Sequence, residues 1–403
     1  MDNLKQTMKD VLEHNILSYW IDHVVDKENG GFYGRIDGDD QIHAQAEKGA
    51  VMNARILWAF SAAYRVLRNP AYLEAATRAK DYFLAHFVDK ENGGVYWSVD
   101  YQGNPLDTKK QTYAIGFAIY GFSEYARATG DAEVLEMAKR LYHDIETHAY
   151  DSENQGYIEA LTCDWQPIAD MRLSDKDENG SRTMNTHLHI IEPYTNLYRV
   201  WKDAALEKSI RNLLDIFTDK LLNPETHHLD LFFDDKWQGK RNVESYGHDI
   251  EASWLLHETA LVLDDKAVLQ KMEQVIRRIA DAADEGLRPD GSMVYEHWKD
   301  TDEYDLQRQW WVQCENIIGH IDLYQYFGYE DSLEKAIQCW NFVQKNLIDA
   351  KNGEWHWAVL DDGTINLKDD KAGFWKCPYH NSRMCLELIE RDYESKGNTI
   401  KIL

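Results

Sequence analysis

The stretch DKENGGFYG at residues 26–34 decides the fold, because it returns almost unchanged as DKENGGVYW at residues 89–97. Weaker copies read DSENQGYIEA, NPETHHLDLFF, RPDGSMVYEHW and DAKNGEWHWAV, at residues 151–160, 223–233, 288–298 and 349–359. Successive copies start about 60 to 72 residues apart, which is the length of two helices with their connections. The sequence therefore predicts six repeats of one helical hairpin.

Two kinds of helix alternate around these copies. Amphipathic helices with a charged face are expected at residues 1–20, 70–87, 131–150, 204–222 and 331–347. Helices that are apolar on nearly all sides are expected at residues 49–67, 113–128, 186–201, 250–263, 312–327 and 380–393. Helices that are apolar all round belong inside a protein, so the second set predicts an inner ring and the first an outer ring.

The predicted fold is an all-α (α/α)6 barrel, formed by residues 1–403 as a single domain. The Asn-Gly and Asp-Gly elements between the helices, followed by alternating aromatic residues, predict turns with short β-hairpins. An open helical solenoid is the alternative that the same repeat allows.

The amino-acid composition argues against some classes of binding partner. The chain has 70 Asp and Glu against 44 Lys and Arg, a formal net charge of -26, which argues against nucleic acid and anionic membranes as partners. No signal peptide or membrane-spanning run is visible in the sequence, so a cytoplasmic protein is expected. The five cysteines lack a C-x-x-C spacing, which predicts reduced thiols and neither disulfides nor a structural zinc site. The 14 Trp and 23 Tyr are typical of a sugar-binding cleft, although many must be core.

Polar and aromatic residues gather at the starts of the predicted inner helices. In a barrel these starts all lie at one end, so their side chains converge on one pocket. Pairs at i,i+3 or i,i+4 spacing share a helical face. The candidates are Arg55, Tyr113, Asn185, His189, His248, Glu251, Trp254, Trp311, Glu315, Trp375 and His380.

Each candidate also has a purely structural interpretation. A single histidine on an apolar helix is more often a core group than a catalyst, and Arg55 could neutralise a buried carboxylate such as Glu251 or Glu315. Trp254 and Trp311 could be packing. Repetition at the same phase of six repeats is what favours a functional pocket.

Other motifs predict no further chemistry. His187 and His189 lie two residues apart on a helix and point to different faces, so they cannot chelate one metal ion. His227 and His228 stand in a turn beside Asp230, which predicts a solvated loop rather than a ligand set. Neither a phosphate-binding loop nor a dinucleotide fingerprint is present in the sequence. No metal and no cofactor is expected.

Four segments carry a resemblance to a known family. MNTHLHIIEPYTNLYR, GHDIEASWLL, QWWVQCEN and GFWKCPYHNSRMCLE, at residues 184–199, 247–256, 309–316 and 373–387, closely resemble motifs of the bacterial cellobiose 2-epimerases within the N-acylglucosamine 2-epimerase superfamily. The resemblance covers essentially the full length. It implies that His189, His248 and His380 are catalytic. It also implies that the sugar is anchored by Arg55, Tyr113, Asn185, Glu251, Trp254, Trp311, Glu315 and Trp375. Trp298 is our choice for the aromatic residue that stacks on the second sugar.

The expected reaction inverts C2 of the reducing-end glucose of cellobiose or a related β-1,4-linked disaccharide, after ring opening and through an enediolate. His380 and His248 exchange protons with the two faces of C2, because histidine titrates near neutral pH. Arg55 and His189 stabilise the enediolate. Glu251 is expected to orient His248 or hold a hydroxyl. Glu315 is expected to do the same near His380.

Four alternatives remain open at this stage. An N-acylglucosamine 2-epimerase or a mannose aldose-ketose isomerase would use the same fold and histidines. A glycoside hydrolase would need Glu251 and Glu315 as its two carboxylates and would leave the histidines unexplained. A non-catalytic carbohydrate-binding protein or scaffold would have no use for the three histidines. A monomer acting on a small carbohydrate is expected.

Overall fold

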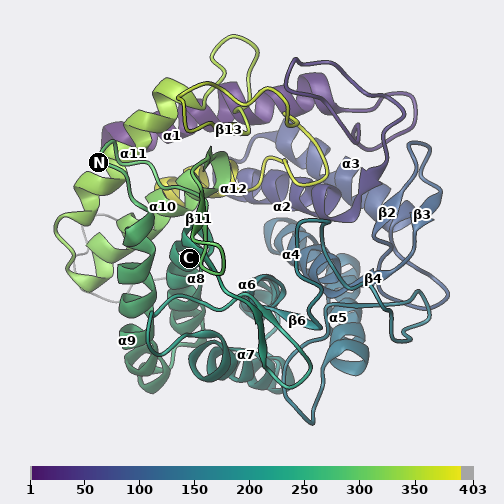
Figure 1. The fold of residues 1–403 in the computed structure, drawn as a ribbon. Helices are drawn as coiled ribbons and strands as arrows, with labels where there is room; N and C mark the ends of the chain where they lie inside the picture. Colours follow the sequence, from purple (N-terminus) through teal and green to yellow (C-terminus); the bar gives the residue numbers. More distant parts are fainter. Residues whose placement is uncertain (1, 392–403) are drawn as a thin grey trace.

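The helices predicted to be buried form a closed inner ring in the computed structural model, which describes residues 2–391. They are α2 (Ala50–Leu67), α4 (Thr112–Thr129), α6 (Met184–Val200), α8 (Tyr246–Leu263), α10 (Trp310–Asp322) and α12 (His380–Glu390). Each contacts the next along the chain, and α12 returns to contact α2 (Figure 1). The (α/α)6 barrel is therefore confirmed, and the open solenoid is excluded because the ring closes.

An outer helix precedes each inner one and packs against the ring (Figure 1). The outer helices are α1 (Asp2–Val11), α3 (Pro70–His86), α5 (Ala132–Asp144), α7 (Ala204–Ile216), α9 (Lys266–Ala283) and α11 (Ser332–Asn346). Their starts are fixed locally, since Asp131, Asp203 and Asp265 each accept hydrogen bonds from two amides of the first turn.

Short irregular helices extend several of these elements. They are the π-helical η1 (Leu12–Leu17), η2 (Trp20–Val24), η3 (Ile145–Ala149), η4 (Phe217–Leu221) and η6 (Leu323–Phe327), and the 3-10 turn η5 (Asp284–Gly286). The helix predicted for residues 380–393 ends at Glu390, and its last two residues lie outside the described part of the chain, as does Met1.

The repeated turns close in the same way in all six repeats. The isolated bridges Val25↔Phe32, Val88↔Val95, Tyr150↔Tyr157, Leu222↔Leu229, Leu287↔Met293 and Ile348↔Trp355 flank the six copies. In the first copy Gly30 and Gly31 have φ of 82° and 59°, and a Cβ at Gly31 would meet the Tyr82 ring at 2.7 Å. Glycine is required there because the turn is left-handed and lies directly on an outer helix.

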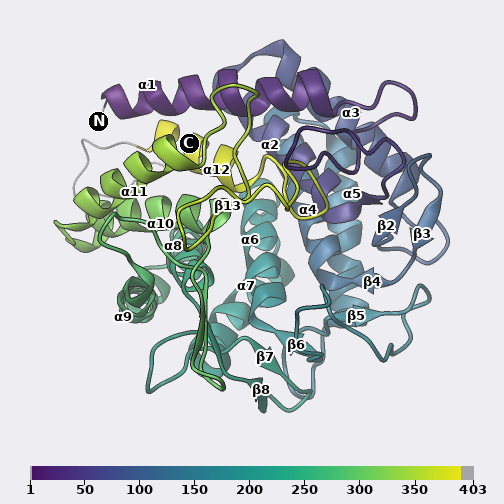
Figure 2. The same ribbon diagram turned by 45° about the horizontal axis from the view of Figure 1, so that its top comes forward.

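The predicted hairpins are short strands placed before the inner helices. They are β1 (Lys48–Gly49), β2 (Ser98–Val99), β3 (Pro105–Asp107), β4 (Lys110–Gln111), β5 (Ala160–Leu161), β6 (Arg182–Thr183), β7 (Phe232–Phe233), β8 (Gly239–Arg241), β9 (Val243–Ser245), β10 (Glu296–Trp298), β11 (Glu303–Asp305), β12 (Arg308–Gln309) and β13 (Ala358–Val359). The strand before an inner helix pairs antiparallel with a strand of the following connection: β1 with β2, β4 with β5, β6 with β7, β9 with β10, and β12 with β13. The hairpins β4 to β8 lie together along one side of the barrel in Figure 2. β4, β6, β9 and β12 each end directly before α4, α6, α8 and α10 begin, so these strands lie at the end of the barrel where the inner helices start.

One hydrophobic cluster fills the space between the two rings, with contributions from inner and outer helices alike. This continuity supports the expectation of a single domain, which stays a prediction. All five cysteines are free, within the part of the chain that the structure describes, in agreement with the sequence analysis. Among residues 2–391 no helix has the length and apolar character needed to cross a membrane.

Candidate active site

A proline inside an inner helix sets the conformation of His189. Pro193 has no amide hydrogen, and its ring displaces the carbonyl four residues earlier, which belongs to His189. His189 accordingly leaves helical geometry, with φ of -91° and ψ of 16°. Its displaced carbonyl lies against Gly116 of α4, where a Cβ would come within 2.4 Å of the oxygen. The kink thus depends on a proline in α6 and a glycine in α4.

The imidazole of His189 is buried and held by a carboxylate. Its Nδ1 lies 2.9 Å from Oε2 of Glu192, one helical turn further along α6. Its ring also meets Tyr113 edge to face, with 5.1 Å between ring centroids. With Nδ1 engaged by a carboxylate, Nε2 is the nitrogen left for a ligand.

His248 is held by a neutral partner. Its Nδ1 lies 2.8 Å from the hydroxyl oxygen of Ser245, the last residue of β9. The expectation that Glu251 orients His248 is therefore wrong: Glu251 stands one turn later but binds Arg383, with 2.5 Å between its Oε1 and Nη2. The His248 ring lies 4.8 Å from the Trp311 ring between centroids, so Trp311 forms its neighbouring wall.

His380 is held by Glu315, as the sequence analysis expected. Its Nδ1 lies 2.7 Å from Glu315 Oε1, and its ring lies 5.6 Å from that of Trp311. The other carboxylate oxygen of Glu315 accepts a hydrogen bond of 2.9 Å from the indole of Trp254. Trp254 is 2% exposed, and its hydrogen bond holds the carboxylate of Glu315 in position.

Arg383 connects these carboxylates. Its guanidinium donates to Glu192, to Glu251 at 2.5 Å and to Glu315 at 2.7 Å, and it is itself 1% exposed. Tyr379 also donates to Glu192. The donor atoms of Glu251, Glu315 and His380 lie close enough together to suggest a metal site. The guanidinium already bonds to both of those carboxylates, so the cation between them is Arg383.

Arg55 lies among aromatic rings instead of carboxylates. Its Nη2 donates to the hydroxyl of Tyr113 at 2.8 Å, and its guanidinium carbon lies 4.1 Å and 4.7 Å from the ring centroids of Phe117 and Tyr379. Glu251 and Glu315, the carboxylates that Arg55 could have neutralised, bind Arg383 instead, and among residues 2–391 no ion pair involves Arg55. Its charge is available to a ligand.

Three candidate residues have buried polar atoms with no hydrogen-bond partner among residues 2–391. They are Nε of Arg55, Oδ1 of Asn185 and Oε2 of Glu251. Buried polar groups in native proteins are almost always satisfied, so such exceptions need an explanation. One donor and two acceptors suit a ligand that carries several hydroxyl groups.

Burial controls the protonation of the two remaining histidines. It lowers the pKa of His248 to about 3, and the charges of His189 and Arg55 act in the same direction. Burial also lowers the pKa of His380 well below its ordinary value, followed by the charges of Arg55 and Arg383. Both imidazoles are therefore neutral near pH 7, which is the form that accepts a proton.

The pKa values of Glu251 and Glu192 are shifted in opposite directions. Burial raises the pKa of Glu251 to about 7, helped by the charge of Glu315 and opposed by Arg383. Burial by itself would also raise the pKa of Glu192. The positive charge of the Arg383 guanidinium outweighs this effect and lowers the pKa of Glu192 to about 2. Glu192 is thus a fixed negative charge behind His189, whereas Glu251 can carry a proton at neutral pH.

The aromatic candidates differ in position. The half-buried Trp375 lies 6.0 Å from the Tyr113 ring between centroids and joins the cluster. Trp298 lies apart on β10, where its indole donates to Glu296 at 3.1 Å. Within residues 2–391 no hydrogen bond or ring contact joins Trp298, or Asn185, to the three histidines. Trp298 is opposite Val243 in the β9–β10 pair, and β9 leads directly into the helix of His248.

Sequence reasoning missed four residues of this network: Ser245, Glu192, Tyr379 and Arg383. Three of them lie within the motif segments, one turn from a candidate histidine or directly beside it, and helical spacing could have found them. Ser245 lies outside the segments, three residues before His248, and only the strand-to-helix geometry at that point brings its hydroxyl onto the imidazole.

Comparison with known proteins agrees with this geometry. Residues 31–383 match the N-acylglucosamine 2-epimerase family. The chain belongs to this family. It is 58% identical to the cellobiose 2-epimerase of Bacteroides fragilis over 386 residues, which covers 96% of this chain and 98% of that protein.

Two solved structures share the fold of this chain but differ in how similar their sequences are to it. The cellobiose 2-epimerase of Bacillus thermoamylovorans superposes with a TM-score of 0.92 at 41% identity, covering 97% of this chain and 100% of that one. A D-mannose isomerase superposes with a TM-score of 0.84 at 20% identity, covering 96% of this chain and 97% of that one, which shows the shared fold alone.

Proposed function

We propose that this enzyme reversibly inverts C2 of the reducing-end glucose of cellobiose and related β-1,4-linked disaccharides, giving glucosyl-mannose. One observation carries the proposal: two neutral imidazoles, His248 and His380, both contact the ring of Trp311 and are each anchored through Nδ1. Two groups that can each give or take a proton are what inversion at one carbon needs. The kinship with cellobiose 2-epimerases supports this choice of reaction.

In the proposed reaction the sugar ring opens first, so that C1 becomes a carbonyl and the proton on C2 becomes acidic. Nε2 of His380 takes that proton, because Glu315 holds its Nδ1. The electron pair of the C2–H bond moves into an enediolate. Nε2 of His248 takes a proton from water and delivers it to the opposite face of C2. His380 then gives the proton it removed from C2 back to water, so both imidazoles are neutral again, and the roles reverse for the other epimer.

Charge on the enediolate oxygens is stabilised by Arg55 and His189. Arg55 is always cationic and has a free Nε in this site. His189 is fixed by Glu192, which accepts the Nδ1 hydrogen and directs Nε2 outward, and in its imidazolium form His189 donates from Nε2 to the enediolate. These donors are in place before the charge develops, and such preorganisation is usually the largest single contribution to catalysis. The buried Glu251 Oε2 and Asn185 Oδ1 are the groups we assign to sugar hydroxyls.

The second sugar extends along the rim of the pocket. Trp298 is half-buried on the hairpin that precedes the helix of His248, and the Arg241 guanidinium carbon lies 5.5 Å from its ring centroid. This position supports, for Trp298, a role with the non-reducing sugar instead of the reacting one. We further propose a cytoplasmic enzyme that acts as a monomer, as one domain, without a metal or cofactor in the chemical step.

Separate incubation with cellobiose, mannose and N-acetylmannosamine tests the proposal. We expect a 2-epimer from cellobiose at a rate far above that with either monosaccharide. Fructose from mannose as the main activity would assign the protein to the aldose-ketose isomerases, and preference for the acetamido sugar to the N-acylglucosamine 2-epimerases. Release of glucose from cellobiose would indicate a glycoside hydrolase. That outcome conflicts with Glu315, both of whose carboxylate oxygens are already bonded to protein groups.

A further inference from the structure

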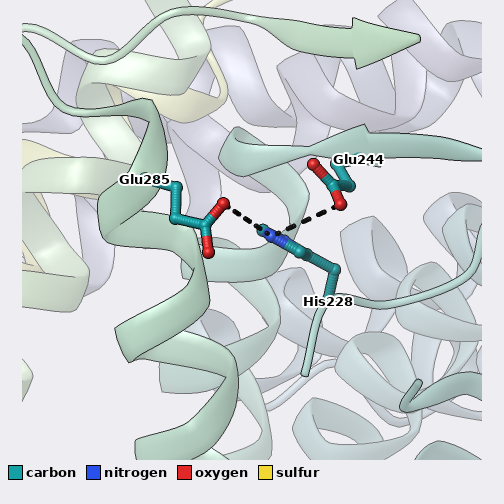
Figure 3. Close-up of side chains that lie close together, drawn as sticks. All are labelled: His228, Glu244 and Glu285. Carbon is teal, nitrogen blue, oxygen red and sulfur yellow. Dashed lines mark ion pairs between the residues drawn. The ribbon is translucent and has the colours of Figure 1, made fainter. Parts of the chain in front are cut away.

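A second cluster of ionisable groups lies outside the proposed sugar site (Figure 3). It consists of His228 in the turn of the fourth repeat, Glu244 in β9 and Glu285 in η5. The figure shows both carboxylates pointing toward the same edge of the imidazole. None of the three has a place in the proposed reaction.

The sequence analysis expected a solvated loop at His227–His228, and for His228 this is wrong. Its side chain is 2% exposed because Asp249, in the first turn of α8, draws the turn inward. One oxygen of Asp249 lies 2.7 Å from His228 Nδ1, and the other accepts the amide hydrogen of Leu229 at 2.9 Å.

The bond to Asp249 fixes the orientation of the imidazole. It leaves Nε2 directed at the two glutamates, and among residues 2–391 this buried nitrogen has no hydrogen-bond partner. Nε2 lies 3.8 Å from Glu244 Oε1 and 3.6 Å from Glu285 Oε2. Both distances are too long for N–H···O hydrogen bonds, which span about 2.7 to 3.2 Å.

The same distances suit ligands of one metal ion. Zinc binds nitrogen and oxygen at about 2.0 to 2.2 Å, so two ligands at a tetrahedral angle lie about 3.3 to 3.6 Å apart. The 3.6 Å separation from Glu285 lies in that range, and the 3.8 Å separation from the buried Glu244 exceeds it by about two tenths of an ångström, a shift that a glutamate side chain can make. A carboxylate on the far nitrogen of a ligating histidine is the usual outer partner of such a metal, and Asp249 occupies that position.

We propose that His228, Glu244 and Glu285 bind a Zn²⁺ ion, with water as the fourth ligand on the side of Glu285. One imidazole with two carboxylates is a ligand set for zinc, whereas calcium and magnesium prefer oxygen alone. The cysteine pattern predicts no structural zinc site, but cysteine spacing does not detect a site built from histidine and glutamate.

The surroundings favour a cation in this position. Three carboxylates, those of Asp249, Glu244 and Glu285, surround the His228 imidazole. Lys299 already supplies one positive charge, with its Nζ 3.2 Å from Glu244 Oε1. Its side chain is 37% exposed and can turn into solvent. Zinc therefore replaces an ammonium group that is present in the metal-free protein.

The ion would join three elements around the start of α8: the repeat turn, β9 and η5. Glu244 directly precedes Ser245, and Asp249 directly follows His248, so the site lies next to the segment that carries one of the proposed acid/base groups. We assign the ion a structural role. Its removal is expected to lower thermal stability and to leave the proton-transfer groups in place.

Metal content and thermal unfolding of the full chain test the proposal. The protein is stripped with EDTA, incubated with ZnCl₂, desalted and measured by plasma mass spectrometry. We expect one zinc per chain. At free zinc a hundredfold above Kd, Tm should rise by about 3 °C for a protein of this size.

Two variants with the same change in charge make the test specific. Glu285→Gln removes an exposed ligand and should abolish both the bound zinc and the rise in Tm. Glu225→Gln alters an exposed carboxylate in the same turn as His228 and should retain both. His228→Gln should behave like Glu285→Gln. Lys299→Met removes the competing ammonium and should tighten zinc binding about two- to fivefold.

Three results would overturn the proposal. The first is wild-type protein that keeps less than about a fifth of an equivalent of zinc and shows no rise in Tm. The second is equal zinc retention in wild type and Glu285→Gln, since the ion would then be bound elsewhere. The third is weaker zinc binding in Lys299→Met, because the Lys299 ammonium group and zinc would then not compete for the same position beside Glu244. In the first case His228 is simply an imidazolium surrounded by carboxylates.

Discussion

The carboxylate behind His380 gives the sharpest test of the proposed chemistry. Glu315→Gln keeps the size and shape of the side chain but removes the charge that lies 2.7 Å from His380 Nδ1. Hydrogen bonds to charged groups contribute about 1.5 to 3 kcal/mol, and those between neutral groups about 0.5 to 1.5 kcal/mol. The imidazolium formed in the transition state thus loses about 1 to 2 kcal/mol, so kcat falls by about five- to thirtyfold.

An amide can also reverse the hydrogen bond. If the NH₂ group of the glutamine donates to Nδ1, the proton of His380 moves to Nε2, the atom that must accept the C2 proton. A base held in the wrong tautomer costs about 10⁴-fold in the serine protease triad. The expected loss in Glu315→Gln therefore lies between about fivefold and 10⁴-fold, and is never smaller.

The pH profile separates this effect from damage to the fold. Burial already lowers the pKa of His380, and the loss of its anionic partner lowers it further. A base with a lower pKa stays neutral to lower pH. The acid limb of kcat/KM should therefore move to lower pH while the plateau falls.

The assay is the initial rate of 2-epimer formation from cellobiose between pH 5 and 9. The matched control is Glu258→Gln, which alters a glutamate of α8 that pairs with Arg199 at 2.6 Å, away from the histidines. The control should keep wild-type kinetics. A Glu315→Gln plateau within twofold of wild type, or an acid limb that moves to higher pH, would show that Glu315 does not activate His380.

Four further predictions use other parts of the site. His380→Asn and His248→Asn should each lower kcat at least about a hundredfold with circular dichroism unchanged, and retention of a tenth of the rate would exclude that histidine as acid or base. Arg55→Lys should be severely impaired, because an ammonium cannot bind two enediolate oxygens at once, and near-normal kinetics would reduce Arg55 to a structural residue. The pKa of Glu251 is raised to about 7 from 4.5, so folded protein holds its proton longer than unfolded protein and stability falls as pH rises from about 4.5 to 7. Glu251→Gln should remove that fall in a Tm-against-pH series, and an unchanged slope would contradict the raised pKa. In D₂O the 2-epimer should carry deuterium at C2, and the primary isotope effect of C2-deuterated substrate should be larger from cellobiose than from glucosyl-mannose. A product that keeps its original C2 hydrogen would contradict two separate acid/base groups.

The fold could be predicted because its cause is periodic. A turn such as that at residues 26–34 uses glycine for its backbone and an aspartate for its amides, and these features recur in the other repeats except the fourth, where His227 takes the positive φ and Asn223 accepts from the amides. Helices apolar on every side can only be inner helices. The same periodicity placed the candidate histidines at one end of the barrel. The helices predicted at residues 131–150 and 204–222 include the turns that extend α5 and α7, but periodicity did not predict that these turns are π-helical.

The partners of the site residues were harder to predict, because they depend on the angle at which helices meet. Glu251 is one turn from His248 in sequence, yet its carboxylate turns toward α12 and binds Arg383. Once Arg383 is buried, it has to be neutralised, and the nearest carboxylates are those of Glu192, Glu251 and Glu315. This single buried charge from the last inner helix decides which glutamates remain available to the histidines.

The different partners of His380 and His248 make the two faces of C2 chemically unequal. A carboxylate strengthens His380 as a base, whereas a serine hydroxyl gives His248 little such help. The overall equilibrium between the two sugars is unaffected, since a catalyst cannot change it. The relative rates of the two proton transfers, removal from C2 and delivery to the enediolate, do differ between the two directions. From the epimer deprotonated by His380, proton removal is assisted and protonation by the more acidic His248 imidazolium is fast. C2–H bond breaking therefore limits turnover in this direction. In the reverse direction the less acidic His380 imidazolium protonates the enediolate slowly, so proton removal by His248 is largely reversed before that step, and the isotope effect should be smaller there.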